Sequence, residues 1–475
     1  MKLKPLLLII LYVLSPFIWA SELPDLGDIS QSTFTPRDEA RVGSAIMRDI
    51  YAEPTYYDDT ELTDYLNTLG ARLVAASSES QRSFQFFVLK DNTLNAFALP
   101  GGYIGVHTGL IEAAQNESEL AGVLGHEIAH VTQHHLARMI ENQSNGILPS
   151  LAALAIAILA SRSNPQVAGG AIAAAQAVSI QKQLNFSRDN EREADRIGMQ
   201  IMSKAGFDPN AMATFFERLQ KYGRIYENNA PAYLRSHPLT TERIADMQNR
   251  AVNLPHKHIA DSLDFQLLRT KLHVMNQSPT AAVREYTDAI QEQHDNGPAN
   301  QYGLTLALMQ ARQYVAAEAA YKKMSPGAAK SPLIDSLGAR IKQNAGDIQG
   351  ALQRYREARS HFPNYRPLMY AYAEALLNAK QTDEAVKFIT DTLILYPEDY
   401  RLYQLQSRAY AQQGKDFLRH YAQAQAYAYQ GNLTAAIEQL QISLKTKDGD
   451  FYQMSIAEAR LKELINQNKI DKPAS

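Results

Sequence analysis

Four histidines and one glutamate lie in the stretch GVLGHEIAHVTQHH, which runs from Gly122 to His135. His126 and His130 are four residues apart, so on a helix both imidazoles project from one face, about one turn apart. Two imidazoles placed in this way can bind a zinc ion at about 2.0 to 2.1 Å. Glu127 lies beside them, where it could take a proton from a zinc-bound water and deliver it to a leaving amine. The stretch therefore predicts a catalytic zinc site for peptide hydrolysis.

A catalytic zinc site needs a third protein ligand. The metzincin class is excluded, because it requires glycine at position 133 and histidine at position 136, where this sequence has Gln133 and Leu136. His134 continues the four-residue spacing, but three successive turns of one straight helix cannot all point at one ion. We interpret His134 and His135 as solvated histidines or as residues that support the ligands from behind.

The remaining ligand candidates lie in FSRDNEREADRIGMQIM, which predicts a second, acidic helix. Glu191 and Asp195 are four residues apart and share one face of that helix. One of them can bind zinc while the other accepts a hydrogen bond from a ligand histidine and fixes its tautomer. Glu193 points elsewhere, and we expect it to be solvated or salt-bridged at the surface.

HEIAH followed by E-x-x-x-D within SRDNEREADRIG resembles the gluzincin family that includes the prenyl-protein peptidases and the membrane-bound HtpX heat-shock peptidases. The resemblance implies a zinc metalloendopeptidase with one zinc ion per chain. It further implies that His126, His130 and Glu191 bind the zinc, that Glu127 is the base, and that Asp195 stands behind the ligands.

The resemblance covers roughly residues 36 to 250 and includes NAFALPGGYI, which matches the family's edge strand. It implies that Asn95, Ala96 and Phe97 align an extended substrate by adding it to the sheet. This chain departs from the membrane members in having no convincing transmembrane helix, which puts a prenylated or membrane-embedded substrate in doubt.

His237 stands before a proline in YLRSHPLTTERIADM. It could be a turn histidine bonded to its own backbone, or an electrophile that stabilises the tetrahedral intermediate. It could also be a fourth zinc ligand that fills the water position and keeps the enzyme latent. Related peptidases carry a histidine in a similar S-H-P segment, which favours a functional role without deciding between the last two.

The periodicity of the apolar residues predicts the elements that position these side chains. Pro36 to Ala75 shows helical spacing, and FQFFVLKDNTLNAFALPGGYIGVHTGLIEA is typical of a strand, a turn and a strand. Glu117 to Arg138 predicts one helix, with Asn116 or Ser118 as its N-cap. The predicted fold class is mainly α: a zincin-like α+β metallopeptidase domain with a small β-sheet over residues 21–255, followed by an α-solenoid.

The solenoid is predicted from a repeat over residues 264–465. Ala317, Ala351 and Ala385 are thirty-four residues apart, and each is followed four residues later by a large side chain. This pattern resembles tetratricopeptide repeats. A later unit around Ala436 is displaced by one and a half periods, which predicts an extra helix near 417–430. Stacked helix pairs offer a concave face for protein partners. The alternative is a solenoid that packs only against its own catalytic domain.

The N-terminus predicts export. Lys2 and Lys4 precede an apolar run from Leu6 to Trp19, which is typical of a signal peptide over residues 1–20, cleaved near Ala20. A membrane anchor is the alternative, but the run is shorter than the roughly 20 residues that span a bilayer. A chain without cysteine cannot form disulfides. Its export suits the periplasm of a double-membraned bacterium, and outright secretion remains an alternative.

The length of 475 residues predicts two or three domains, and the net charge of −3 favours no nucleic acid partner.

Residues 147–184 are rich in alanine, leucine and isoleucine. They predict a buried helical hairpin or, alternatively, a flap that makes a peripheral membrane contact.

The order of signal peptide, soluble gluzincin domain and tetratricopeptide repeats resembles a periplasmic branch of the family. That resemblance implies quality control of outer-membrane β-barrel proteins: assisting their assembly and degrading those that stall. The repeats would bind the substrates and their assembly machinery. The alternative is an assembly factor or chaperone whose peptidase is mostly latent.

Overall fold

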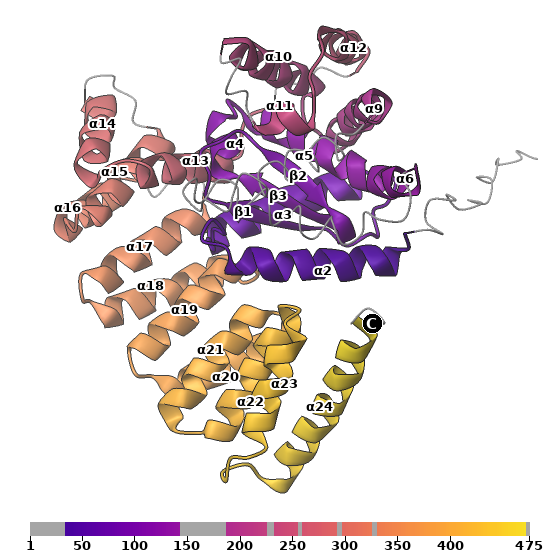
Figure 1. Ribbon diagram of the computed structural model, residues 1–475. Coiled ribbons are helices and arrows are strands. Elements are labelled where there is room, and N and C mark those ends of the chain that lie inside the picture. The colour runs from indigo at the N-terminus through magenta and orange to yellow at the C-terminus, as the bar shows by residue number, and fades with distance from the viewer. Residues whose placement is uncertain are drawn as a thin grey trace, which may run out of the picture.

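The computed structural model describes residues 34–142, 187–225, 232–254, 259–291, 297–324 and 330–471. They form a mainly helical structure around one small sheet, which confirms the predicted fold class (Figure 1). The predicted signal peptide and the apolar segment 147–184 lie outside the described residues. Among the residues that are described, no helix is both long and apolar enough to cross a membrane.

The first half of the chain contains the sheet and the helices around it. Its elements, in order, are α2 (Pro36–Ala52), α3 (Thr60–Ala75), β1 (Gln85–Leu89), β2 (Ala96–Leu99), the short 3-10 turn η2 (Pro100–Gly102), β3 (Tyr103–His107), α4 (Thr108–Ala113), α5 (Glu117–Thr132), α6 (His135–Asn142), α9 (Arg188–Lys204), α10 (Pro209–Ile225), α11 (Ala232–Ser236) and α12 (Thr241–Val252).

The sheet has the strand order β1-β3-β2, with β1 parallel and β2 antiparallel to β3. Side chains alternate between its two faces. Phe86 and Val88 pack into the core with α3 and α5, while Phe87 and Leu89 pack against α2. The turn before β3 contains Gly102 with a φ of 82°, where a Cβ would lie 2.4 Å from the carbonyl oxygen of Ser83. β2 is thus left at the edge of a sheet that helices cover on both faces.

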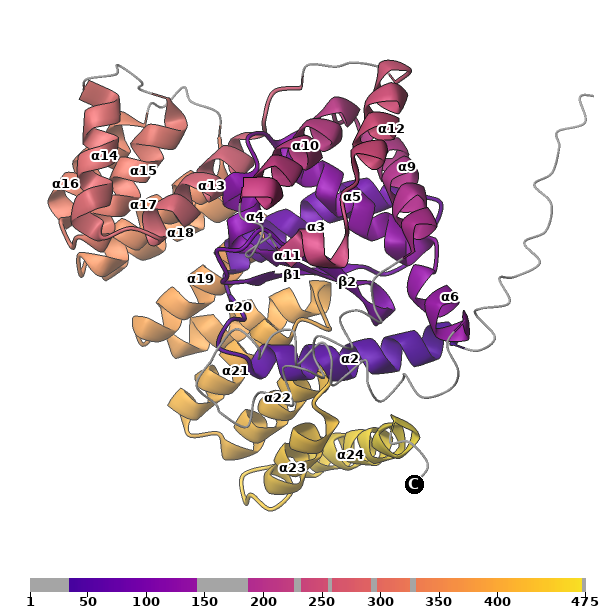
Figure 2. The same ribbon diagram turned by 45° about the horizontal axis from the view of Figure 1, so that its top comes forward.

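Helices α5 and α9 cross at two glycines. A Cβ at Gly198 would lie 2.9 Å from the backbone nitrogen of His126, and one at Gly125 would lie 3.0 Å from the carbonyl oxygen of Gly198. The missing side chains let the two backbones approach closely. Figure 2 shows α9 beside α5, with α12 next to α9. The crossing brings the acidic first turn of α9 to the face of α5 that carries the two histidines.

The second half of the chain is a series of paired helices. They are α13 (Leu263–Met275), α14 (Pro279–Gln291), α15 (Pro298–Gln310), α16 (Tyr314–Lys323), α17 (Pro332–Asn344), α18 (Ile348–His361), α19 (Arg366–Asn378), α20 (Thr382–Leu395), α21 (Tyr400–Gln413), α22 (Asp416–Tyr429), α23 (Leu433–Ser443) and α24 (Phe451–Asp471). The repeated alanines Ala317, Ala351 and Ala385 are all buried, in α16, α18 and α20. Helix α22 lies where the sequence predicts an extra helix.

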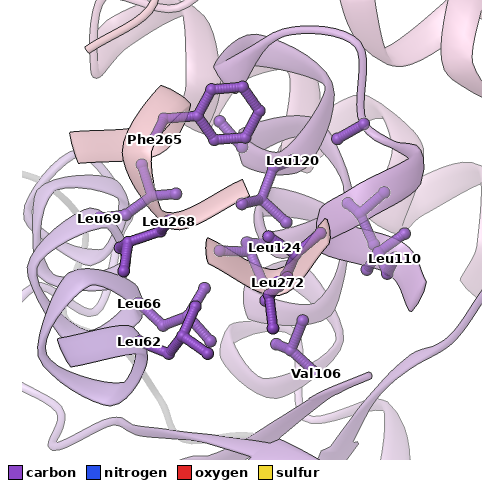
Figure 3. Close-up of a cluster of buried hydrophobic side chains, with 14 of the residues drawn as sticks. Leu62, Leu66, Leu69, Val106, Leu110, Leu120, Leu124, Phe265, Leu268 and Leu272 are labelled. Atoms are coloured by element: carbon purple, nitrogen blue, oxygen red, sulfur yellow. The ribbon is translucent and has the colours of Figure 1, made fainter. Parts of the chain in front are cut away.

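One hydrophobic core joins the two halves. Leu62, Leu66 and Leu69 of α3 meet Leu120 and Leu124 of α5, and the first repeat helix α13 completes the cluster (Figure 3). That helix contributes the residues Phe265, Leu268 and Leu272. Because these side chains leave water together, α13 is part of the same folded unit as the sheet.

Ion pairs extend the contact between α3 and the repeats. Lys271 Nζ lies 2.6 Å from Glu61 Oε2, and Arg340 Nη2 of α17 lies 3.6 Å from Glu61 Oε1. Arg366 Nε of α19 lies 3.7 Å from Asp64 Oδ1. The repeats therefore run along one side of the first domain (Figure 1), where α13 and α19 contact α3.

Candidate metal centre

Four side chains that could bind one metal ion come together from three segments of the chain. His126 and His130 lie on α5, Glu191 lies in the first turn of α9, and His237 directly follows α11. One ligand atom from each side chain lies within 4.8 Å of all the others, and all four residues are buried. The helical spacing and the α5–α9 crossing thus bring His126, His130 and Glu191 together, and the turn after α11 adds His237, which is 111 positions from His126.

The distances fit a tetrahedral ion. His126 Nε2 lies 3.0 Å from His130 Nε2. Glu191 Oε2 lies 3.6 Å from His126 Nε2, and Glu191 Oε1 lies 3.4 Å from His130 Nε2. Four ligand atoms at about 2.0 to 2.1 Å from a zinc ion stand about 3.3 Å apart. Two imidazoles and a carboxylate are also the donor set of a catalytic zinc site. The residues present therefore fit a divalent metal ion, typically zinc.

His237 stands in the same ring of ligand atoms. Its Nδ1 lies 2.9 Å from Glu191 Oε1 and 3.4 Å from His126 Nε2. Its other nitrogen, Nε2, lies 3.6 Å from Glu127 Oε1. The backbone N–H of His237 donates to the carbonyl oxygen of Tyr233 at 2.8 Å, and the Tyr233 ring stacks on the imidazole. This position combines a turn hydrogen bond with a place among the four candidate metal ligands.

Glu127 is 1 % exposed and lies beside the ligand cluster. Burial raises the pKa of its carboxyl above the ordinary value, and His237 and His126 oppose that rise only in part. Burial also disfavours the charged form of Glu191, but His237, His126 and His130 hold the pKa of that carboxyl well below its usual value. The same site thus raises the pKa of Glu127 and lowers the pKa of Glu191.

Asp195 lies behind His126, with Oδ1 3.0 Å from the histidine's Nδ1. Arg243 of α12 holds this carboxylate with two hydrogen bonds, donated by Nε at 2.7 Å and Nη2 at 2.8 Å. Its Nη1 also lies 2.7 Å from Glu191 Oε2. Sequence reasoning missed Arg243, although it stands only six residues after His237 in the segment singled out for that histidine.

The predicted helix from Glu117 to Arg138 is interrupted in the structure. Asn116 caps α5, as one of the two predicted N-caps, but α5 ends at Thr132 and α6 begins at His135. His134 between them has a φ of 50°, and its Nε2 lies 2.9 Å from Glu79 Oε1, away from the ligands. One straight helix over this region is therefore wrong, because a left-handed residue cannot continue an α-helix.

The break turns His135 towards the metal ligands. His135 Nδ1 lies 2.8 Å from His130 Nδ1, and its Nε2 lies 3.1 Å from Glu193 Oε2. Glu193 also accepts a hydrogen bond from Arg138 at 2.9 Å. Glu193 is salt-bridged, as expected, but it is also the partner of a fully buried histidine.

The edge strand lies against α5. The N–H of His107 on β3 donates to the carbonyl oxygen of Asn95 at 3.0 Å, so in this antiparallel pair Asn95 and Phe97 turn their backbone groups towards β3. Ala96 and Ala98 turn theirs to the free edge. Of the three residues predicted for substrate alignment, only Ala96 turns its backbone groups to the free edge, where a substrate could pair with them. Ala98, which was not predicted, does the same.

Comparisons with known proteins agree with this geometry. Residues 61–251 match the peptidase family M48, and residues 344–409 match a tetratricopeptide repeat. The β-barrel assembly-enhancing protease of Escherichia coli O157:H7 is 33% identical over 465 residues, which are 96% of this chain and 93% of the relative.

Two further relatives match parts of the chain. A Vibrio cholerae relative is 41% identical over 300 residues, which make up 62% of each protein, so the match spans less than two thirds of that relative. The mitochondrial metalloendopeptidase OMA1 of Schizosaccharomyces pombe is 31% identical over 218 residues, 44% of this chain and 60% of the relative. Together with the His-His-Glu-His cluster, these matches show that the chain is a metalloendopeptidase of peptidase family M48 and belongs to the β-barrel assembly-enhancing proteases.

Proposed function

We propose that this chain is a zinc-dependent endopeptidase of the periplasm that degrades misassembled outer-membrane proteins and assists their assembly. The observation that carries the proposal is the buried cluster of His126, His130 and Glu191 with Glu127 beside it. The barrel-assembly part rests on the name of the Escherichia coli relative, which aligns over nearly the whole chain. The periplasmic location rests on the predicted signal peptide.

The three ligands His126, His130 and Glu191 would hold one zinc ion per chain. When bound, zinc lowers the pKa of a water molecule towards about 7 and polarises the scissile carbonyl. Glu127 takes the proton of the attacking water and passes it to the departing amine. Its raised pKa suits this task, because a general base works best when its pKa lies near the operating pH.

The edge strand would hold the substrate. An extended peptide paired with β2 would exchange hydrogen bonds with the backbone groups of Ala96 and Ala98, which adds a strand to the sheet. Because β2 lies against α5, this pairing would run the peptide past Glu127. Backbone pairing requires an extended peptide but does not depend on its side chains. This suits an enzyme that cleaves unfolded or stalled proteins.

His237 would keep the resting enzyme latent. Its Nδ1 stands within the ring of ligand atoms, 2.9 Å from Glu191 Oε1, where a fourth ligand would take the water position of a catalytic zinc site. A role of His237 in latency is therefore better supported than a role as an electrophile or as a turn histidine without function. The same observation favours the second candidate function, an assembly factor or chaperone whose peptidase is mostly off.

The repeats would recruit protein partners, which we propose to be outer-membrane β-barrel proteins and their assembly machinery. Part of the solenoid surface already contacts α3 through Lys271, Arg340 and Arg366. Partners would use the surface that this contact leaves open. No nucleic acid partner is proposed, and a peripheral membrane contact through residues 147–184 remains a prediction about residues that the structure does not describe.

The test of this function is metal removal and replacement. Because latency would hide the effect, the test uses the purified His237→Ala variant. Chelation should abolish its cleavage of an unfolded outer-membrane protein, and one equivalent of zinc should restore it. Cleavage that persists in the chelated protein would overturn the proposal.

A further inference from the structure

We propose that Glu193 and His135 form a positioning relay for the metal ligand His130. Glu193 holds the buried ring of His135, and His135 fixes the tautomer and the orientation of the His130 ring. The proposal rests on the zinc site proposed above and assigns a role to two residues that the mechanism does not use.

The contacts form an unbroken chain from the surface to the ligand. Glu193, whose side chain is 29 % exposed, accepts from Arg138 and lies 3.1 Å from His135 Nε2. His135 is fully buried, and its Nδ1 lies 2.8 Å from Nδ1 of His130. His130 then presents Nε2 to the ligand cluster, 3.0 Å from His126 Nε2.

The chemistry of imidazole determines which atom donates in each hydrogen bond of this series. A ligand nitrogen must offer its lone pair to the metal, so His130 binds through Nε2 and carries its proton on Nδ1. His130 Nδ1 therefore donates to His135 Nδ1, because two protons cannot lie between two nitrogens 2.8 Å apart. His135 must then carry its own proton on Nε2, which donates to the Glu193 carboxylate. Each member thus sets the proton position of the next.

Through the relay, a carboxylate supports His130 indirectly, whereas the carboxylate of Asp195 supports His126 directly. Asp195 Oδ1 lies 3.0 Å from His126 Nδ1 without any residue between them. His130 lies one turn further along α5, where Glu193 reaches it only through an intervening imidazole. Helix α9 thereby carries the ligand Glu191 together with the carboxylates that support both histidines.

The interrupted helix makes the relay possible. In one continuous α-helix, residues five positions apart point about 140° away from each other, so the side chain at 135 would turn away from that at 130. The left-handed His134, with a φ of 50°, ends α5 and lets α6 restart with His135 facing back towards His130. The backbone break has a consequence for the ligand and is not only a surface turn.

Zinc affinity of the purified full-length chain tests the relay, measured by competition with a chromophoric chelator. We expect His135→Ala and Glu193→Ala to weaken zinc binding about 10- to 100-fold, the usual cost of losing a group that supports a ligand. His135→Asn should recover much of the loss, since its amide oxygen can still accept from His130 Nδ1. Glu193→Gln should lose less than Glu193→Ala, because it keeps an acceptor for His135.

His134→Asn is the matched control, because it removes the neighbouring imidazole, which contacts Glu79, while asparagine tolerates the left-handed conformation of this position. It should bind zinc as the wild type does. Thermal unfolding of each metal-free variant separates a role at the metal from a merely structural one. If His135→Ala fails to fold, the two variants at the partly exposed Glu193 decide.

The relay is wrong if folded His135→Ala or Glu193→Ala binds zinc as tightly as His134→Asn does. It is also wrong if any loss of affinity is matched by an equal loss in metal-free stability and is not recovered in His135→Asn. A wild-type protein that binds no zinc would overturn the proposed function as well, whereas tight wild-type binding with unaffected variants would overturn the relay alone.

Discussion

His237 Nδ1 lies 2.9 Å from Glu191 Oε1, inside the ring of atoms that can hold one metal ion. The segment that carries His237 is also tied to the residues just before the edge strand β2, since the N–H of Tyr233 donates to the carbonyl oxygen of Leu94 at 3.2 Å. The residue that would block the metal's open position and the strand that would receive the substrate are therefore joined by one short helix, α11. Latency and substrate alignment share the same small region of the structure.

His237→Ala should raise peptidase activity, because it removes the side chain that we propose to take the water position. The rate of cleavage of an unfolded outer-membrane protein by the purified variant measures this, with zinc content determined in parallel. A fall in activity at full zinc occupancy would show instead that His237 stabilises the transition state.

Arg243→Ala should destabilise the protein strongly. The guanidinium is 2 % exposed and is shared by Asp195 and Glu191, so its removal leaves buried carboxylates without their partner. Breaking a buried pair in this way costs about 3 to 5 kcal/mol. The free energy of unfolding in urea measures the effect.

Arg250→Ala is the control for Arg243→Ala on the same helix. Its side chain is 43% exposed and pairs with Asp246, and an exposed pair contributes only about 0 to 1 kcal/mol. Similar losses in the two variants would mean that Arg243 does not hold the two carboxylates together.

Ala98→Pro should weaken the binding of extended substrates. The substitution removes an N–H at the free edge and leaves the hydrogen bonds between β2 and β3 in place. Because this N–H also faces the Glu127 carboxyl, lost pairing is recognised by a rise in KM, whereas an effect through the base lowers kcat. The loss of one hydrogen bond of about 1.4 kcal/mol corresponds to a roughly tenfold fall in kcat/KM. Peptide kinetics measure it, together with thermal unfolding to confirm that the strand is intact. An unchanged kcat/KM in a folded variant would argue against backbone pairing at Ala98.

The contact between α3 and the repeats should loosen in acid. Burial disfavours the Glu61 carboxylate, but Arg340 and Lys271 lower its pKa from the ordinary 4.5 to about 2. A carboxyl whose pKa is lower in the folded state stabilises that state at neutral pH, and the contribution is lost as the pH falls from about 4.5 towards 2.

Glu61→Gln removes this titration while keeping the size of the side chain. The variant should unfold at a lower temperature than the wild type at pH 7, and the two melting temperatures should converge as the pH falls below 4.5. A constant difference across that range would mean that the charge of Glu61 does not hold the repeats against α3.

Local spacing predicted much of the candidate metal site, because residues four apart on a helix share one face. Four-residue separations placed His126 beside His130 and Glu191 beside Asp195, and the family resemblance chose Glu191 as the ligand. The role of Arg243 could not be predicted, because its partners Glu191 and Asp195 lie on another helix. The break at His134 was missed because the apolar periodicity continues through it.

The repeats show the same limit. The period of 34 residues predicted the buried alanines Ala317, Ala351 and Ala385, since each packs within its own helix pair or the next. It did not predict that α3 lies against the solenoid, because that contact joins Glu61 to Lys271 across 210 residues. The period of the sequence predicts packing between helices that follow one another along the chain. The packing of one domain on another depends on contacts that leave no local pattern in the sequence.

Glu127→Gln tests the central claim most directly, and it is best measured in the His237→Ala background so that latency cannot hide the result. Glutamine keeps the size of the side chain but cannot take up the proton of the attacking water. The double variant should bind one zinc per chain and leave an unfolded outer-membrane protein intact, while His237→Ala alone cleaves it. Cleavage by the zinc-loaded double variant at the rate of His237→Ala would contradict the assignment of Glu127 as the base and, with it, the proposed mechanism.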